Sequence, residues 1–315
     1  MTRAFTFPGQ GSQVVGMGRE LAESRPVAAR VFEEVNDALG QDLRSVMFDG
    51  PQEELTLTHN AQPALMAVSI AVMRVLEEDF GVKLQDAAAY VAGHSLGEYS
   101  ALTAAGALSL SDAAKLLRLR GEAMQRAVPV GEGAMAAILG LEMEAVEEVV
   151  KEAAQGDICT AANDNANGQI VISGHKAAVE RAIPIAKEKG AMKGVLLPVS
   201  APFHCALMQP AAEEMKAALA ETTINAPAVP VIANVTAAPE SDPVKIRDLL
   251  VEQVTGRVRW RESVLKMGEL GVDTLVEAGA GKVLTGMVRR IDKSISGISL
   301  QTAEEIEAFA ASLKN

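Results

Sequence analysis

Cysteine, aromatic residues and positive charge are all scarce in this sequence. Of its 315 residues, 2 are cysteines and 3% are aromatic, and 29 Lys and Arg stand against 41 Asp and Glu, which gives a formal net charge of -12. Cys159 and Cys205 are too few for a disulfide framework or a structural zinc site, so we expect a reducing, cytoplasmic setting. The acidic balance argues against a nucleic-acid partner, because nucleic-acid-binding proteins gather positive charge against the phosphates.

Long apolar runs are missing as well. Runs such as residues 64–70 fall far short of the roughly 20 residues that span a bilayer, which excludes a membrane-spanning helix. We therefore expect no membrane partner. The first residues do not combine a basic region with an apolar stretch, so we expect no secretory signal. What is present is a globular composition, with 49% hydrophobic and 22% charged residues, in a chain long enough to bury one large core or two.

Strand-like and helix-like segments alternate along most of the chain, which predicts an α/β fold with a largely parallel sheet. The expected strands of this sheet are residues 4–7, 87–91, 229–234 and, as the last one, 274–277. The expected helices are residues 20–39, 63–80, 96–108, 111–128, 205–220, 244–254 and 283–291.

The segment from 130 to 198 follows a different order, strand-helix-strand-strand-helix-strand. Its expected strands are residues 134–139, 158–162, 169–173 and 192–197, its expected helices are 142–154 and 177–189, and an Asn/Gly-rich turn covers 163–168. This order is the ferredoxin-like arrangement. We therefore predict a main domain of residues 1–129 and 199–315, with an inserted ferredoxin-like subdomain of residues 130–198.

The strongest local signal is Gly93-His94-Ser95-Leu96-Gly97, a G-x-S-x-G motif between an apolar strand and an Ala-rich helix. A nucleophile on a sharp strand-to-helix turn crowds the flanking backbone, and glycine two residues to either side relieves this crowding. Ser95 would then lie at a helix N-terminus, where free N–H groups favour developing negative charge. The motif predicts an activated serine; the alternative is an ordinary turn in which Ser95 caps the helix.

A serine nucleophile needs a base, and the chain has 4 histidines. His94 adjoins Ser95 and should point elsewhere, His59 precedes a predicted helix, and His175 opens a helix in the inserted segment. His204 lies in a loop where the main domain resumes, and catalytic residues favour such loops. By elimination we predict His204 as the base, with a solvent-exposed helix-start histidine as the alternative. No acid suits a triad, so we expect a Ser–His pair with a neutral orienting group.

Arg120 lies within the apolar stripe of the predicted helix 111–128, one turn from Leu117 and one from Met124. An inward guanidinium needs a partner, because an unpaired buried charge is costly. One interpretation is structural, either a salt bridge to a buried carboxylate or snorkelling to the surface. The other is a fork that holds a substrate carboxylate by bidentate hydrogen bonds. The residue pattern alone leaves both open.

Several motifs, in order along nearly the whole chain, resemble those of the malonyl-CoA:acyl carrier protein transacylases of fatty-acid synthesis. They are FPGQGSQ at 7–13, GHSLGEYS at 93–100, LRLRG around Arg120, GAM at 133–135, FHCALM at 203–208, NVT at 234–236 and EAGAGKVL at 277–284. The family has an α/β-hydrolase-like core with an inserted ferredoxin-like subdomain, which agrees with the two-part prediction.

The resemblance also implies roles for single residues. Ser95 would be the acylated nucleophile and His204 its base. The backbone N–H groups of Gln10 and Leu96 would form the oxyanion hole. The backbone carbonyl of Gln253 would orient the histidine, which would account for the missing acid.

Two further residues concern the acyl group. By the resemblance, Arg120 would hold the malonyl carboxylate. In related acyltransferase domains a Phe before the histidine accompanies malonyl and a Ser accompanies methylmalonyl, so Phe203 would lie beside the acyl chain and leave no room for a methyl branch. The alternative for Phe203 is packing in the core, away from the substrate.

The implied reaction is a ping-pong transfer of malonyl from malonyl-CoA to the phosphopantetheine thiol of acyl carrier protein, with no metal or redox cofactor. Acyl carrier proteins are acidic as a family, so a local basic patch must receive this partner on an acidic chain. Two clusters qualify, although each could equally be a solvated surface. They are Lys187, Lys189 and Lys193 in the inserted segment, and Lys282, Arg289 and Arg290 near the C-terminus. The sequence does not indicate an oligomeric state.

Two other functions compete with this one. A serine hydrolase, either a thioesterase or a lipase, would share Ser95 and His204, but a lipid hydrolase would have no use for an inward Arg120. A non-catalytic module that binds carrier proteins would need none of these three residues. The sequence therefore favours the transferase.

Overall fold

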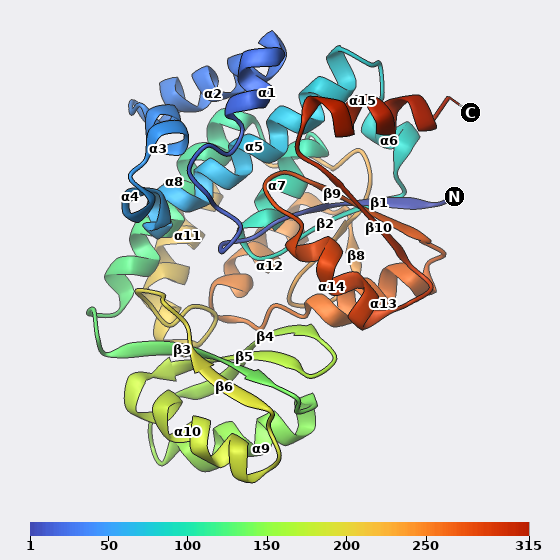
Figure 1. Cartoon of the computed structure of the whole chain (residues 1–315). Coiled ribbons are helices and arrows are strands. Elements are labelled where there is room, and N and C mark those ends of the chain that lie inside the picture. Colours follow the sequence, from blue (N-terminus) through green and yellow to red (C-terminus); the bar gives the residue numbers. More distant parts are fainter. Residues whose placement is uncertain (315) are drawn as a thin grey trace.

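Two separate β-sheets organise the chain, of which the computed structural model describes residues 1–314 (Figure 1). The larger sheet has six strands in the order β10-β9-β1-β2-β7-β8, and every neighbouring pair is parallel except β7 and β8. This confirms the predicted α/β fold with a largely parallel sheet. Its strands are β1 (Arg3–Phe7), β2 (Tyr90–Gly93), β7 (Val231–Ile232), β8 (Pro239–Glu240), β9 (Thr274–Ala278) and β10 (Ser296–Leu300).

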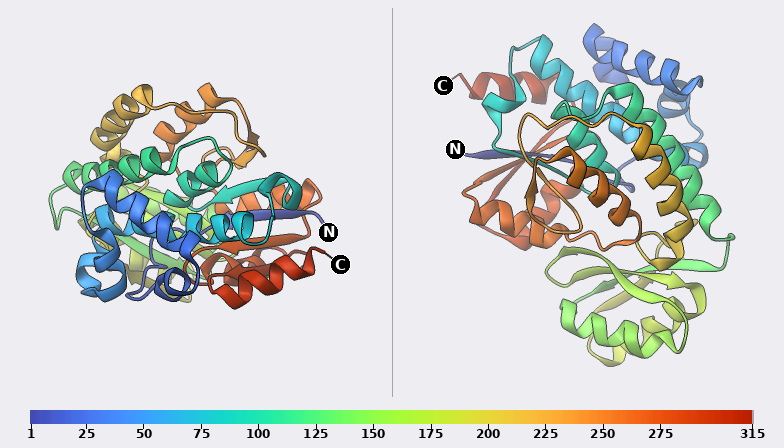
Figure 2. Two further views of the ribbon diagram at one scale, coloured as in Figure 1. Left: turned by 90° about the horizontal axis from the view of Figure 1, so that it is seen from above. Right: turned by 180° about the vertical axis from the view of Figure 1, so that it is seen from behind.

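Helices lie on both sides of the larger sheet (Figure 2), and the strand sequences alternate to match. In β1, Phe5 and Phe7 face the larger apolar core, which includes much of α5 (Thr58–Glu78) and α7 (Leu96–Ala104). Ala4 faces a smaller core, to which α13 (Trp260–Glu269) and α14 (Val283–Ile291) contribute. Within residues 1–314, no helix is both long and apolar enough to cross a membrane. The helices of this part are α1 (Arg19–Ser24), α2 (Pro26–Leu39), α3 (Leu43–Asp49), α4 (Gln52–Thr56), α5 (Thr58–Glu78), α6 (Leu84–Ala87), α7 (Leu96–Ala104), α8 (Leu110–Ala127), the 3-10 turn η1 (Ala206–Met208), α11 (Gln209–Glu221), α12 (Pro243–Thr255), α13 (Trp260–Glu269), α14 (Val283–Ile291) and α15 (Ala303–Ser312).

The smaller sheet is antiparallel throughout, in the order β4-β5-β3-β6. Helices α9 and α10 pack on the face that turns away from the larger part, around a separate apolar core (Figure 1). On the opposite face, Met135 and Val171 join the core of the larger part. The elements follow one another as β3 (Gly133–Leu139), α9 (Met143–Ala154), β4 (Cys159–Ala166), β5 (Gln169–His175), α10 (Lys176–Glu188) and β6 (Lys193–Leu196).

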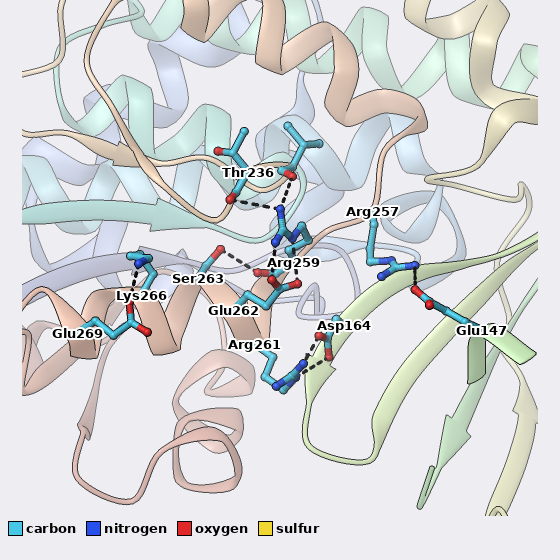
Figure 3. Close-up of polar contacts among 11 residues, drawn as sticks. Glu147, Asp164, Thr236, Arg257, Arg259, Arg261, Glu262, Ser263, Lys266 and Glu269 are labelled. Atoms are coloured by element: carbon cyan, nitrogen blue, oxygen red, sulfur yellow. Dashed lines mark hydrogen bonds and ion pairs between the residues drawn. The ribbon is translucent and has the colours of Figure 1, made fainter. Parts of the chain in front are cut away.

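Strand β4 and helix α9 are tied to the larger part by arginines from the segment before and within α13 (Figure 3). The carboxylate of Asp164 accepts from Arg261 Nε at 3.1 and 3.0 Å. Arg257 donates from Nε to the carbonyl of Ala161 at 3.0 Å and from Nη2 to Glu147 at 2.8 Å. These contacts fix the smaller sheet against the edge of the larger part where the functional residues gather.

Some predicted elements near the N-terminus differ from the structure. The helix predicted over 20–39 is two helices, because Arg25 is extended before Pro26. The helix predicted to start at Pro63 begins at Thr58, since a proline near the start of a helix removes only one backbone hydrogen bond. The strand predicted over 87–91 lies at Tyr90–Gly93, and residues 84–87 form the short helix α6.

Other differences lie later in the chain. The strand predicted as the last one, 274–277, is followed by the edge strand β10 and by α15, and α13 fills a stretch in which no element was expected. The predicted turn 163–168 is shorter, because β4 continues to Ala166. The helix predicted over 205–220 begins with the 3-10 turn η1 before α11.

Candidate active site

The loops that follow β1, β2 and β7 meet at one edge of the larger sheet, because these parallel strands all end there. They carry Gln10, Ser95 and Asn234 respectively. Over this edge lies a cavity of about 470 Å³, lined by both parts of the chain. Six of the residues singled out from the sequence line this cavity together, namely Gln10, Ser95, Leu96, Arg120, Phe203 and His204. Gln253 lies behind them, fully buried in α12.

Ser95 occupies the sharp turn that the G-x-S-x-G motif predicts. It follows β2, precedes α7 and has φ 54° and ψ -110°, a backbone conformation that costs a non-glycine residue free energy. A Cβ at Gly93 would lie 1.9 Å from the carbonyl carbon of Gly97, and a Cβ at Gly97 would lie 2.2 Å from the carbonyl oxygen of Phe7. Only glycine fits at both positions, so the motif is explained by the geometry of the turn.

His204 contacts the Ser95 hydroxyl. Its Nε2 lies 2.8 Å from Ser95 Oγ, and its Nδ1 lies 2.9 Å from the carbonyl oxygen of Gln253 and 3.2 Å from that of Gly256. Because carbonyl oxygens only accept hydrogen bonds, Nδ1 carries the proton and Nε2 is free to accept from the serine. Burial, assisted by the charge of Arg120, lowers the pKa of His204 to about 3, so the ring is neutral.

The groups that contact His204 Nδ1 are neutral, since both are backbone carbonyls. That they orient the ring stays a prediction. No carboxylate of the described residues contacts the ring.

Arg120 is buried, with 1% exposure, and points into the cavity. Its Nη2 donates to Ser95 Oγ at 3.1 Å and to Gln253 Oε1 at 2.8 Å, and its Nη1 donates to Gln62 Oε1 at 2.7 Å. No ion pair to Arg120 is present within residues 1–314, and the guanidinium does not reach the surface. The two structural interpretations of this residue, a salt bridge and snorkelling, are thus both wrong. A buried cation held only by neutral groups can bind an anion in the cavity.

Two backbone N–H groups beside Ser95 lack an acceptor. Neither Gln10 N nor Leu96 N forms a hydrogen bond in the described part of the chain, and both residues line the cavity. Leu96 opens α7, whose free N–H groups favour negative charge. Gln10 is held in place through its side chain, which accepts from Thr58 Oγ1 at 2.9 Å. These N–H groups are suited to stabilising an oxyanion.

Phe203 combines the two placements considered for it. Its side chain belongs to the larger apolar core, is 8% exposed and also lines the cavity beside His204. The ring is therefore packed and at the same time able to limit the size of a bound acyl group.

The remaining histidines lie away from Ser95 Oγ. His94 points elsewhere, as predicted: its Nε2 lies 2.8 Å from Asn165 Oδ1 and its ring packs against Trp260. His59 lies in the first turn of α5, and His175 precedes α10. Within residues 1–314, no three His, Cys, Asp or Glu side chains are arranged to hold a metal ion. That the reaction needs no cofactor stays a prediction.

Three polar residues that the sequence analysis did not single out hold the site together. Gln62 accepts from Arg120, and Asn234 accepts the Ser95 N–H at 2.8 Å while donating to the Gly93 carbonyl at 2.7 Å. Glu98 accepts from the Asn234 N–H at 3.0 Å. All three are 1% exposed. Glu98 and Asn234 lie in two of the motifs quoted above, GHSLGEYS and NVT, where no role was assigned to them, and Gln62 lies outside those motifs.

Comparison with known proteins gives the family of the chain. The family model described as acyl transferase domain matches residues 4–307. The chain is 48% identical over 312 residues to the malonyl CoA-acyl carrier protein transacylase of Bacillus subtilis (strain 168), covering 99% of this chain and 97% of that one. The solved acyl-carrier-protein-S-malonyltransferase of Bartonella henselae is 58% identical, with a TM-score of 0.98 and 100% of both chains covered.

A further solved structure contains a type II PKS acyl-carrier protein in complex with its malonyl-transacylase. The matched chain is 44% identical to this one, with a TM-score of 0.96 and coverage of 99% of this chain and 100% of that chain. By the family match over most of its length and by these full-length identities, the chain belongs to the malonyl CoA-acyl carrier protein transacylase family of acyl transferases.

Proposed function

We propose that this protein transfers the malonyl group from malonyl-CoA to the phosphopantetheine thiol of acyl carrier protein, through a malonyl ester of Ser95. The observation that carries the proposal is the buried guanidinium of Arg120, 3.1 Å from Ser95 Oγ in a cavity that His204 also lines. A carboxylate bound to Arg120 would hold the far end of a malonyl group while its thioester carbonyl lies at the serine. Fatty-acid synthesis would consume the product.

In the first half-reaction, Ser95 Oγ attacks the thioester carbonyl carbon and its proton passes to His204 Nε2. The carbonyl oxygen becomes an oxyanion beside the N–H groups of Gln10 and Leu96. The carbon–sulfur bond then breaks, and the departing thiolate of coenzyme A takes the proton from His204.

In the second half-reaction, the phosphopantetheine thiol gives its proton to His204 and attacks the ester carbonyl. The ester bond to Ser95 breaks, and Ser95 Oγ recovers the proton. Each half-reaction ends with neutral His204, so the enzyme returns to its starting state without a metal or redox cofactor.

The substrate would also strengthen the base. Burial is the main cause of the low pKa of His204, and the charge of Arg120 lowers it further. A malonyl carboxylate bound to Arg120 offsets that charge, and the pKa of His204 rises when the proton has to be accepted. An acetyl group offers no such compensation.

The runner-up function is a thioesterase, which would use water in place of the carrier-protein thiol. The test is the release of coenzyme A from excess malonyl-CoA with and without acyl carrier protein. A transferase releases about one equivalent alone and turns over only with the carrier protein; steady release without it would assign a hydrolase. A non-catalytic binding module would release none.

The finer description of the fold belongs to the same proposal. We infer that residues 1–129 and 199–314 form an α/β-hydrolase-like core and that residues 130–198 form an inserted ferredoxin-like subdomain; residue 315 of the predicted range lies outside the described residues. The nucleophile at the turn after β2 supports the first part, and the strand order β4-β5-β3-β6 with both helices on one face supports the second. The two cysteines, both unpaired and buried, favour a cytoplasmic protein.

A further inference from the structure

One buried carboxylate at the site has no part in the proposed reaction. Glu98, in the first turn of α7, is 1% exposed. Its Oε2 accepts from the backbone N–H of Asn234 at 3.0 Å and from Gln253 Nε2 at 2.9 Å, and within residues 1–314 it forms no ion pair. Burying a carboxylate without an ion pair costs free energy, so we expect the role of Glu98 to lie in what its two hydrogen-bond partners do.

The first partner is Gln253, whose side-chain amide forms hydrogen bonds through both its nitrogen and its oxygen. Its Nε2 donates to Glu98 and to the Ser95 carbonyl at 3.0 Å, while its Oε1 accepts from Arg120 Nη2 at 2.8 Å. The two ends of an amide have nearly the same shape, but only the oxygen can accept from a guanidinium. A carboxylate at Glu98 requires the NH2 end and so directs the oxygen of Gln253 toward Arg120.

The second partner, Asn234, holds the turn that carries the nucleophile. Its side chain bridges the Ser95 N–H and the Gly93 carbonyl, and its own N–H is held by Glu98. The N–H and the carbonyl of Ser95, a residue at φ 54°, are thus bound by two residues that both donate to one carboxylate.

We propose that Glu98 is a positioning residue for acyl-group selectivity: by orienting the Gln253 amide it holds Arg120 where the malonyl carboxylate binds. This inference rests on the proposed function. Glu98 acts through Gln253 and does not touch the substrate.

The protonation of Glu98 should make the acyl-group selectivity depend on pH. Burial raises the pKa of Glu98 to about 7, although its hydrogen bonds and Arg120 oppose this shift. The groups that face it are Arg120 from α8 and Tyr99 on its own helix. Burial lowers the pKa of Arg120, but an arginine side chain keeps its charge, and burial raises the pKa of Tyr99 to about 12. His204 is neutral near pH 7. A protonated Glu98 accepts hydrogen bonds more weakly, so Arg120 is held less firmly below about pH 7.

The test compares the rates at which malonyl-CoA and acetyl-CoA acylate the wild type and Glu98→Gln, a change that keeps the shape and removes the charge. We expect the malonyl-to-acetyl ratio to fall about tenfold or more, the effect of a weakened hydrogen bond to a charged group. We also expect the wild-type ratio to rise with pH through about 7 and the ratio of Glu98→Gln to be flat there. Gln253→Met, which removes the bridge, should lower the ratio in the same direction and serves if Glu98→Gln does not fold.

Glu277→Gln is the matched control. Glu277 is also 1% exposed, and its carboxylate accepts from the backbone N–H groups of Leu284 and Thr285 at 3.1 and 2.7 Å, at the start of α14. This variant should keep the wild-type ratio and its pH dependence. An equal loss of malonyl and acetyl rates in Glu98→Gln, or an unchanged ratio, overturns the inference. A wild type that forms no malonyl ester overturns the proposed function instead.

Discussion

At the scale of the residue, Arg120 carries the distinction between malonyl and uncharged acyl groups. Arg120→Ala should lower malonyl transfer roughly a hundredfold or more while acetyl transfer falls much less, because only malonyl presents an anion to the guanidinium. Arg120→Lys should be intermediate, since an ammonium cannot present the planar fork. The measurement is kcat/KM for malonyl-CoA and acetyl-CoA with each variant. Equal losses for both substrates would make Arg120 a structural residue.

Phe203 should limit the size of the acyl group, because its ring lines the cavity next to His204. In Phe203→Ser, the ratio of methylmalonyl to malonyl transfer in a competition assay should rise by about 10- to 200-fold, which is the discrimination that one methyl group typically provides in a pocket. A variant that is folded and active but keeps the wild-type preference would show that other residues set the size limit.

What the sequence could show at this scale depended on local pattern. Ser95, His204 and Arg120 stand out through a motif, an elimination among few histidines and a charge in an apolar stripe. Gln62, Glu98 and Asn234 do not, because their importance arises from contacts between segments far apart in the chain. The hydrogen bond from the Ser95 N–H to Asn234 Oδ1 joins residues that are 139 positions apart in the chain, and the spacing of residues in a sequence does not predict such a contact.

At the scale of the element, a buried ion pair is one of the contacts that hold strand β4 against the larger part. The carboxylate of Asp164 is 1% exposed and its partner Arg261 is 25% exposed. Burial raises the pKa of Asp164 despite this partner. Arg261→Ala would leave the carboxylate alone, and we expect the free energy of unfolding to fall by about 3–5 kcal/mol.

Lys266→Ala is the control for this prediction, because Lys266 pairs with Glu269 on the exposed side of the same helix (Figure 3). Its loss should stay within about 1 kcal/mol. Urea denaturation of both variants measures the difference, and losses of equal size would contradict the importance given to the Asp164 pair.

The elements that the sequence did not reveal are those with weak local signals. Edge strand β10 leaves Ile298 partly exposed and pairs on one side only, so its alternation is faint. Helix α13 is ten residues long, and its buried positions Trp260, Val264 and Met267 were too few to stand out. By contrast, the predicted helix 283–291 has the bounds of α14, because an apolar stripe coincides with a clear start and end.

At the scale of the whole molecule, an acidic chain must receive an acidic carrier protein. Each cluster has one lysine that is already paired: Lys189 with Glu148 and Glu152, and Lys282 with Glu305. On α14, Arg289 forms no ion pair within residues 1–314, and Arg290 donates to Gln169 at the hairpin that follows β4. Strand β4 in turn supplies Asn163 and Asn165 to the cavity. The α14 cluster is therefore the better placed of the two.

We expect Arg289→Glu to raise the KM for acyl carrier protein about tenfold and to leave the rate of malonyl-enzyme formation from malonyl-CoA unchanged, because a surface charge steers the partner and takes no part in the chemistry. Lys187→Glu in the other cluster should have the smaller effect. If transfer to acyl carrier protein is unchanged after the charges of both clusters are reversed, electrostatic attraction to these clusters does not guide docking.

The measurement that tests the central claim most directly is the mass of the intact protein after incubation with malonyl-CoA. The wild type should gain one malonyl group and lose it when acyl carrier protein is added, and Ser95→Ala should gain none. A malonyl adduct on Ser95→Ala, or a wild type that stays unmodified, would contradict the assignment of Ser95 as the nucleophile of a malonyl transfer.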